Sequence, residues 1–103
     1  MVSINTFRKI AMALPDTIEQ PHFEKLAFKA GKKRIYCTLS EKEGTAAVRL
    51  SEVDQSVYSD IDPKMIYPVP NKWAKQGWTV IDLKRIPVAL LKEVLRKAYE
   101  YAR

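Results

Sequence analysis

The sequence predicts an α+β fold, a two-layer sandwich in which helices cover one face of an antiparallel sheet of about five strands. Apolar and polar residues alternate through the middle of the chain and again near residue 80, which is typical of half-buried strands. Apolar residues recur at helical spacing near both ends of the chain and once between them. The expected order is helix, three strands, helix, two strands, helix.

The composition is that of a folded protein. At 103 residues, with 47% apolar and 29% charged residues, we expect one domain over residues 1–103 with a single hydrophobic core. No apolar run approaches the roughly 20 residues that span a bilayer, and the N-terminus lacks a secretory signal pattern. The only cysteine, Cys37, has strand-like apolar neighbours, so we expect a small buried hydrophobe without a disulfide and a cytoplasmic location.

The N-terminal segment is expected to be a helix that Ser3 caps and that Pro15 and Asp16 end. Its apolar residues at helical spacing are Ile4, Phe7, Ile10, Ala11 and Leu14. Residues 16–23 are then expected to be a polar connection. This connection holds the only histidine, His22, which has no Cys, Asp or Glu at ligand spacing and is interpreted as a loop or packing residue.

A meander of three strands is expected next, at residues 23–30, 34–40 and 46–50. Tight turns at Gly31-Lys32 and at residues 41–44 should connect them. One face of the meander should pack on the helices. By strict alternation the outer face should carry Lys25, Lys29, Arg34, Tyr36 and Arg49. This would be a basic face that contains an aromatic residue.

The second predicted helix begins at a capping box, Ser51 to Asp54. Its buried side is expected to carry Val53, Val57 and Ile61 at positions i, i+4 and i+8. The acidic cluster around it consists of Glu52, Asp54, Asp60 and Asp62. Helix capping and solvation explain these carboxylates without a metal site.

Two more strands and a helix should complete the fold. Residues 65–69 can form a short edge strand, and residues 71–77 a turn-rich or single-helical-turn connection. The basic and aromatic residues of this connection are Lys72, Trp73 and Lys75. Residues 78–83 are the last predicted strand, in which alternation assigns Trp78 to the outer face. The final helix starts near Pro87, and its apolar stripe is Val88, Leu91, Val94, Leu95, Ala98 and Tyr101.

The net charge of +6 is unevenly distributed. Basic residues gather from Lys25 to Arg34 and from Lys64 to Arg85, whereas acidic residues gather between the two groups. Such segregation can attract a polyanion at one place and repel it at another. No nucleophile, base and orienting group are recognisable together, and the isolated glycines do not form a phosphate-binding loop. We therefore expect a non-enzymatic protein without cofactor or metal.

A set of short motifs carries a resemblance to a known family. They are Leu14-Pro15, Glu19, Phe23, Phe28-Lys29, Gly31-Lys32, Pro70, Gly77-Trp78, Val80 and Leu83. In order and spacing they resemble the MmcQ/YjbR family of small bacterial proteins, from about residue 7 to residue 102. The resemblance implies a CyaY-like fold, similar to frataxin and to secretion chaperones, a cytoplasmic location, and a proposed DNA-binding role through a "double wing". The chain departs from the family at Asp16, where glycine is common, and at Ala98-Tyr99, where a Ser-Tyr pair is common.

The function expected from these features is weak, largely sequence-independent DNA binding. Basic residues on strands and turns can reach phosphates, while aromatic residues can stack on bases. Residues 32–34 would form one wing, and Lys72 with Lys75 the other. The candidate nucleic-acid-binding residues are Lys25, Lys29, Lys32, Lys33, Arg34, Tyr36, Arg49, Lys72, Trp73, Lys75 and Trp78. Both tryptophans could instead be core or edge-covering residues, and no helix has the spacing of a base-reading helix.

Two other functions stay open at this point. One is a protein-binding adaptor of the secretion-chaperone type, which would use the open sheet or the apolar rim near Trp73. The other, a frataxin-like iron carrier, is disfavoured because frataxin-type binding needs an acidic first helix, whereas this helix offers Arg8 and Lys9. The expected partner is therefore DNA or another protein and not a membrane, and we expect a monomer.

Overall fold

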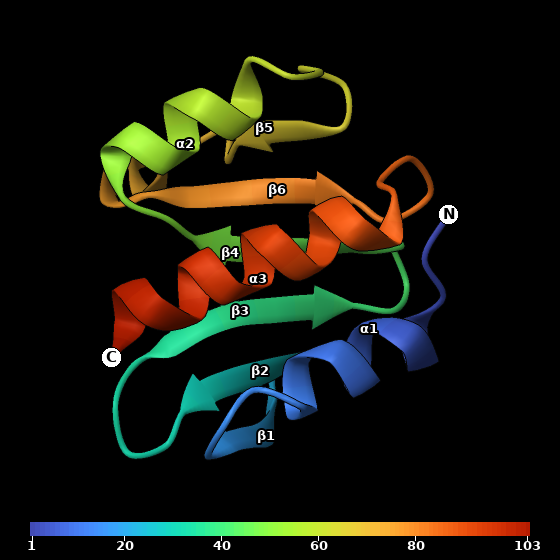
Figure 1. Cartoon of the computed structure of the whole chain (residues 1–103), viewed down its shortest axis with the longest axis vertical. Coiled ribbons are helices and arrows are strands. Elements are labelled where there is room, and N and C mark those ends of the chain that lie inside the picture. Colours follow the sequence, from blue (N-terminus) through green and yellow to red (C-terminus); the bar gives the residue numbers. More distant parts are fainter.

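The computed structural model describes all 103 residues and has two layers (Figure 1). One layer is a sheet of six antiparallel strands in the order β1-β2-β3-β4-β6-β5. The strands are β1 (Thr17–His22), β2 (Lys25–Ala30), β3 (Ile35–Ser40), β4 (Thr45–Arg49), β5 (Ile66–Pro68) and β6 (Trp78–Asp82). The helices are α1 (Ile4–Met12), α2 (Glu52–Ser59), α3 (Val88–Ala102) and the short 3₁₀ helix η1 (Lys72–Gln76). This confirms the predicted α+β sandwich, with six strands instead of about five.

The core lies between the sheet and helix α3, which crosses β3 and β4 (Figure 1). The fully buried residues of α3 are Leu91, Val94, Leu95 and Ala98. Helix α1 adds Phe7, whose ring lies edge-on to Phe28 of β2 with the centroids 5.8 Å apart. The predicted stripe of α3 is correct except near its two ends, where Val88 and Tyr101 are 39% and 42% exposed. None of the helices is both long and apolar enough to cross a membrane.

Residues 16–23, expected to be a polar connection, instead contain the edge strand β1. It pairs with β2 from Thr17, opposite Ala30, to His22, opposite Lys25. The prediction was wrong because residues 17–22 do not alternate between apolar and polar residues. An edge strand without a fully buried residue, such as β1, does not need that alternation. Its proline is tolerated because an edge strand can lack an N–H on its outer side. Glu19 of β1 accepts a hydrogen bond from the guanidinium of Arg8 at 2.7 Å, and this bond lowers the pKa of the Glu19 carboxyl group.

A bulge in β3 changes the expected division of side chains between the two faces. Phe28 pairs with Cys37 and Lys29 with Ile35, so Tyr36 is an extra residue without a partner on β2. An extra residue of this kind bends the strand and shifts its alternation. Ile35, and not Tyr36, therefore shares the outer face with Lys29. The prediction that Tyr36 lies on the outer face was wrong, because alternation alone cannot reveal a bulge.

Tyr36 is instead a fully buried residue that joins three elements. Its hydroxyl donates to the carbonyl oxygen of Ala11 in α1 at 3.1 Å and lies 3.0 Å from Thr17 Oγ1 in β1. Its ring lies edge-on to Tyr99 of α3, with the centroids 5.5 Å apart. Burial raises the pKa of the Tyr36 phenol. The neighbouring Cys37 is also fully buried, as predicted, and burial raises the pKa of its thiol.

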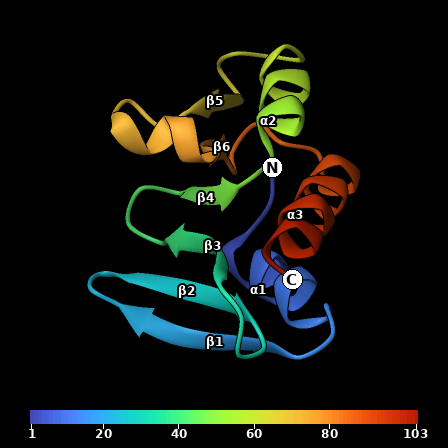
Figure 2. The ribbon, with the colours of Figure 1, turned by 90° about the vertical axis from the view of Figure 1, so that its left-hand side faces the viewer.

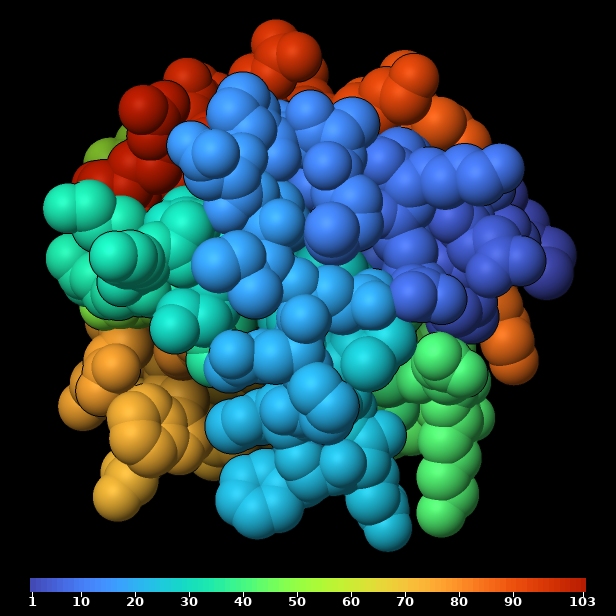
Figure 3. Space-filling view, turned by 90° about the horizontal axis from the view of Figure 1, so that it is seen from below, coloured from blue at the N-terminus to red at the C-terminus, as the bar shows by residue number.

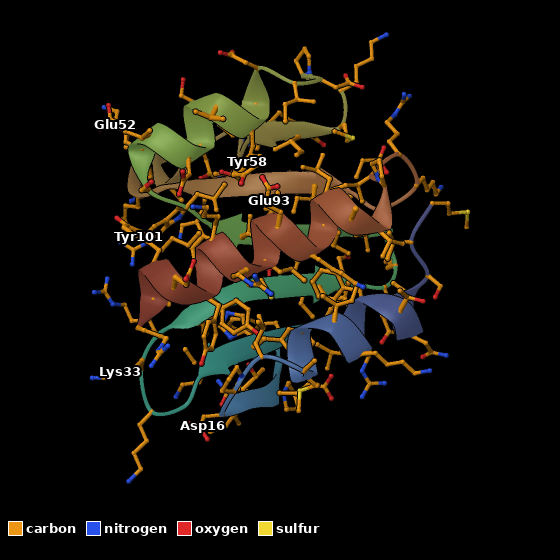
Figure 4. All side chains as sticks on the ribbon, viewed as in Figure 1. Asp16, Lys33, Glu52, Tyr58, Glu93 and Tyr101 are labelled. Atoms are coloured by element: carbon orange, nitrogen blue, oxygen red, sulfur yellow. The ribbon has the colours of Figure 1, made fainter.

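Helix α2 presents a polar side to the sheet, the reverse of the prediction. The residues expected on its buried side are more than half exposed: Val53 (70%), Val57 (55%) and Ile61 (55%). Gln55 points inward, and its Nε2 donates to the carbonyl oxygens of Ala74 at 3.0 Å and Trp78 at 3.2 Å. Tyr58 is directed toward Glu93 of α3 (Figure 4), and its hydroxyl donates to Glu93 Oε2 at 2.5 Å. The helix faces backbone carbonyls at this end of the sheet, which an amide can bind and a valine cannot.

Gly77 allows the start of β6 to approach the end of β4 closely. The amide of Leu50 donates to the Gly77 carbonyl oxygen at 2.9 Å. Gly77 has a φ of 98°, and a Cβ on it would lie 1.8 Å from the carbonyl oxygen of Leu50. Only glycine fits such a position. The contact holds Trp78 of β6 opposite Arg49 of β4 on the outer face.

We expect Gly77→Ala to lower the free energy of unfolding by more than about 4 kcal/mol, because the backbone of residue 50 must move. The control is Gly44→Ala. Gly44 has a φ of 69°, but its nearest neighbour would be the flexible Lys84 side chain at 3.6 Å, and we expect a loss of about 1–2 kcal/mol. Urea denaturation followed by circular dichroism measures both. Equal losses in the two variants would contradict the close approach at Gly77.

Candidate nucleic-acid interface

The helices α1, α2 and α3 leave the outer face of the sheet uncovered (Figure 2). The β1–β2 hairpin and η1 both project on the side opposite α1 and α3, and β3 and β4 lie between them (Figure 2). Viewed from below, the hairpin turn (light blue to cyan) and the segment around η1 (gold) project at the edge opposite α3 (red; Figure 3). Small cross-strand neighbours lie on this face in a row: Ala27 of β2, Thr38 of β3 and Ala47 of β4. The outer face is therefore hollowed between two projections.

A depression at one end of this face is lined almost entirely by basic and polar residues. We call it the basic pocket, a cavity of about 380 Å³ lined by Gln20, Lys29, Lys33, Arg34, Ile35, Arg49, Gln76 and Trp78. No acidic residue lines it. The two ion pairs of the protein join Arg8 to Glu19 and Arg85 to Asp82, so no carboxylate pairs with the cations of the basic pocket. Unneutralised cations around a concave surface attract anions.

Arg49 is held in the basic pocket from two sides. Its Nε donates to the carbonyl oxygen of Gln76 at 3.0 Å. Its guanidinium carbon lies 5.4 Å from the ring centroid of Tyr101 at the end of α3, which is within cation–π range. A guanidinium has five N–H donors, and a protein acceptor binds only one of them here. Arg49 is thus positioned by the fold, and its other donors can bind an anion.

The turn between β2 and β3 supplies the remaining cations of the basic pocket. The Gly31 amide donates to the Asp16 carbonyl oxygen at 2.8 Å, and the Lys33 amide donates to the Ala30 carbonyl oxygen at 3.0 Å. Gly31 and Asp16 have φ angles of 60° and 59°, in the left-handed region that favours glycine. Figure 4 shows Lys33 on the same side of the molecule as Tyr101. The turn therefore presents Lys33 and Arg34 from an anchored backbone.

A second depression adjoins the basic pocket at Trp78. We call it the aromatic pocket, a cavity of about 350 Å³ lined by His22, Lys25, Thr38, Ala47, Val69, Asn71, Trp73 and Trp78. Trp73 is 49% exposed, whereas Trp78 is half-buried. Asn71 Oδ1 accepts a hydrogen bond from the Trp73 amide at 2.9 Å and caps η1. The Lys72 Nζ lies 5.6 Å from the Trp73 ring centroid, so a cation lies over this ring.

Another group of cations lies in the helix layer. A depression of about 350 Å³ between α1 and α3 is lined by Lys9, Ile10, Ala13, Leu14, Lys92 and Arg96. It contains three cations and no aromatic ring. It is therefore less basic than the pocket on the sheet, and it offers a matched control for experiments on that pocket.

The structure brings most of the candidate residues together. Those in the basic pocket are Lys29, Lys33, Arg34, Arg49 and Trp78, and Lys25 and Trp73 line the aromatic pocket with Trp78. Lys32, Lys72 and Lys75 are exposed but line neither pocket. Tyr36 is the one candidate that is excluded, because it is fully buried.

Sequence reasoning missed several residues of the two pockets. Gln20 and His22 face the pockets from β1, which was not recognised as a strand. Ile35 reaches the outer face only because of the bulge. Gln76 lies in η1, whose position depends on the contact at Gly77. No local pattern marks the last two residues, whereas a strand assignment for residues 17–22 would have found the first two.

The groups that could support catalysis or metal binding are not assembled. No three His, Cys, Asp or Glu side chains lie close enough to hold a metal ion together. The Cys37 thiol is fully buried, and its raised pKa disfavours the nucleophilic thiolate. His22 is exposed on the β1–β2 hairpin beside the ring of Phe23.

Comparisons with known proteins agree with this fold. The family model described as YjbR matches residues 12–101, which include all six strands and both pockets. The chain is similar to the crystal structure of a Deinococcus radiodurans protein with a DUF419 domain, with a TM-score of 0.82 and 25% sequence identity. That match covers 96% of this chain and 77% of the other. No curated protein matches the chain.

Proposed function

The chain belongs to the YjbR family, and we propose that it is a non-enzymatic cytoplasmic protein that binds DNA weakly and largely independently of sequence. The observation that carries this proposal is the basic pocket, with four cations and no acidic residue. The free thiol of Cys37, fully buried and unpaired, supports a reducing compartment.

Phosphate groups are the part of DNA that this surface suits. Each cation that neutralises a phosphate releases condensed counterions, which supplies affinity without reading sequence. Arg34 and Arg49 add forked donors, which match phosphate oxygens better than an ammonium group does. The acidic cluster around α2 would repel the phosphates of the bound DNA. Figure 4 shows Glu52 of α2 well separated from Lys33 across the sheet, so the charges would orient bound DNA.

Sequence-independent binding follows from the elements that project on the outer face. They are a hairpin and a short 3₁₀ helix, whereas the three α-helices lie on the other face (Figure 2). No α-helix is therefore presented to a major groove, which is the usual way to read bases in a duplex. The β1–β2 hairpin, in place of the turn at residues 32–34 expected from the sequence, and η1 with Lys72 and Lys75 would be the two wings of a double-wing arrangement. Contacts from such wings fall on phosphates and sugars.

Removing the two turn cations should weaken DNA binding. For Lys33→Gln/Arg34→Gln we expect the slope of log Kd against log salt to fall by about 1–2, because two phosphate contacts are lost. The matched control is Lys92→Gln/Arg96→Gln, which removes one lysine and one arginine from the depression between α1 and α3. Fluorescence anisotropy with labelled DNA of mixed sequence, from about 50 to 200 mM salt, measures the slopes. No binding at low salt, or equal losses in both variants, would refute the proposal.

A protein-binding adaptor is the second candidate, and the exposed stripe on α2 favours it. The stripe consists of Val53 and Val57 of α2 and Ile61 in the turn that follows the helix. Helix α2 cannot roll to bury these residues without losing the hydrogen bonds of Gln55 and Tyr58. Four acidic residues lie on α2 or directly after it, namely Glu52, Asp54, Asp60 and Asp62. Like charges would oppose a second copy of α2 or an anionic membrane, so the fitting partner is a basic amphipathic helix.

We expect a synthetic amphipathic peptide of leucine and lysine to bind the stripe. Val53→Gln/Val57→Gln should weaken its binding roughly tenfold, and the free energy of unfolding should change by less than about 0.5 kcal/mol because both side chains are exposed. Anisotropy of the labelled peptide measures the affinity, and a leucine-glutamate peptide is the control. Equal binding of both peptides, or by both proteins, would remove this second candidate.

A further inference from the structure

We propose that the outer face binds single-stranded DNA, with a phosphate in the basic pocket and an unpaired base in the aromatic pocket. This inference rests on the proposed DNA binding and names the form of nucleic acid that the same site takes. Trp78 lines both pockets, so they are adjacent parts of one surface. A phosphate bound by Arg49, the cross-strand partner of Trp78, would place a neighbouring base beside that ring.

The walls of the aromatic pocket favour the face of a base over its edge. Trp73 and Trp78 supply two aromatic rings, and base–aromatic stacking requires an exposed base face. In a duplex the base faces are stacked on one another, and only base edges reach the grooves. Only an unpaired nucleotide can therefore use both tryptophans.

The floor of the aromatic pocket leaves room for a flat ring. Ala47 and Thr38 are cross-strand neighbours on the outer face, and Ala27 continues the row on β2. Larger side chains at these positions would fill the hollow. Its volume of about 350 Å³ lies at the lower end of the range for small-ligand pockets. Thr38, Asn71 and His22 around it can form hydrogen bonds with the edge of a bound base.

The hollow continues beyond the aromatic pocket, and a binding site for several nucleotides of single-stranded DNA requires such a length. A third depression of about 310 Å³ shares Lys25, Thr38, Ala47, Val69 and Asn71 with the aromatic pocket. Among the residues that it adds are Tyr67, Val80 and Glu43, which is the one acidic residue that lines any of the three depressions. The three depressions together form one trough from the basic pocket, past Trp78 and Trp73, to Tyr67. A row of aromatic rings beside a basic groove is the common arrangement for single-stranded nucleic acids.

Trp73 is the side chain that tests this inference, because it is half-exposed and outside the buried core cluster. We expect the wild-type protein to bind an oligo(dT) of about 12 nucleotides more tightly than a duplex of equal length at the same salt. Trp73→Ala should weaken binding of oligo(dT) roughly 5- to 150-fold, the loss of one stacked base. It should weaken duplex binding much less, because contacts of the η1 wing with a duplex fall on phosphates and sugars. Trp73→Phe, which keeps an aromatic face, should restore most of the affinity. Anisotropy of the labelled oligonucleotides measures all three proteins.

The outcomes separate this inference from the proposed function. If oligo(dT) and the duplex bind equally well and Trp73→Ala changes neither, DNA binding stands and the single-strand inference is wrong. If Trp73→Ala weakens both equally, the ring contacts the backbone, and the inference is also wrong. If neither oligonucleotide binds even at low salt, both proposals fail. A selective loss of oligo(dT) binding with rescue by phenylalanine supports the inference.

Discussion

The burial of Tyr36 at a bulge in β3 is the interaction on which both layers depend. Its hydroxyl joins α1 to β1, and its ring meets Tyr99, whose own hydroxyl donates to the Pro15 carbonyl oxygen at 2.6 Å. These contacts hold the N-terminal segment against α3, so that β1 can pair as an edge strand. The same bulge places Ile35 beside Lys29 on the outer face. One extra residue thus stabilises the core and completes the basic pocket.

Local sequence patterns predicted the structure correctly where a single local interaction determines it. Ser3 and Ser51 cap their helices as predicted, since each hydroxyl oxygen accepts a backbone N–H three residues on. Local sequence patterns gave a wrong prediction where tertiary contacts determine which side of a helix is buried. Gln55 is directed inward, where its amide donates to carbonyl oxygens of η1 and β6, although Val57 on the same helix is more apolar. No helical period in the sequence contains that information.

The candidate site was predictable in the same uneven way. Alternation assigned Lys29, Arg49 and Trp78 to the outer face, because successive side chains of a regular strand point to opposite faces of the sheet. It could not show that they meet Gln76, since that depends on the fit of Gly77 against β4. None of the cations of the basic pocket forms an ion pair, so their charges gain no ion-pair energy on folding. Their value lies in binding.

The most direct test of binding on the outer face is a map of where a single strand contacts the protein. Amide and indole NMR shifts would be followed as oligo(dT) is added to the uniformly ¹⁵N-labelled protein. The account predicts that the largest changes occur at Lys29, Arg49 and Trp78 and at the indole N–H of Trp73. Changes confined to Lys9 and the basic residues of α3, in the depression between α1 and α3, would contradict it.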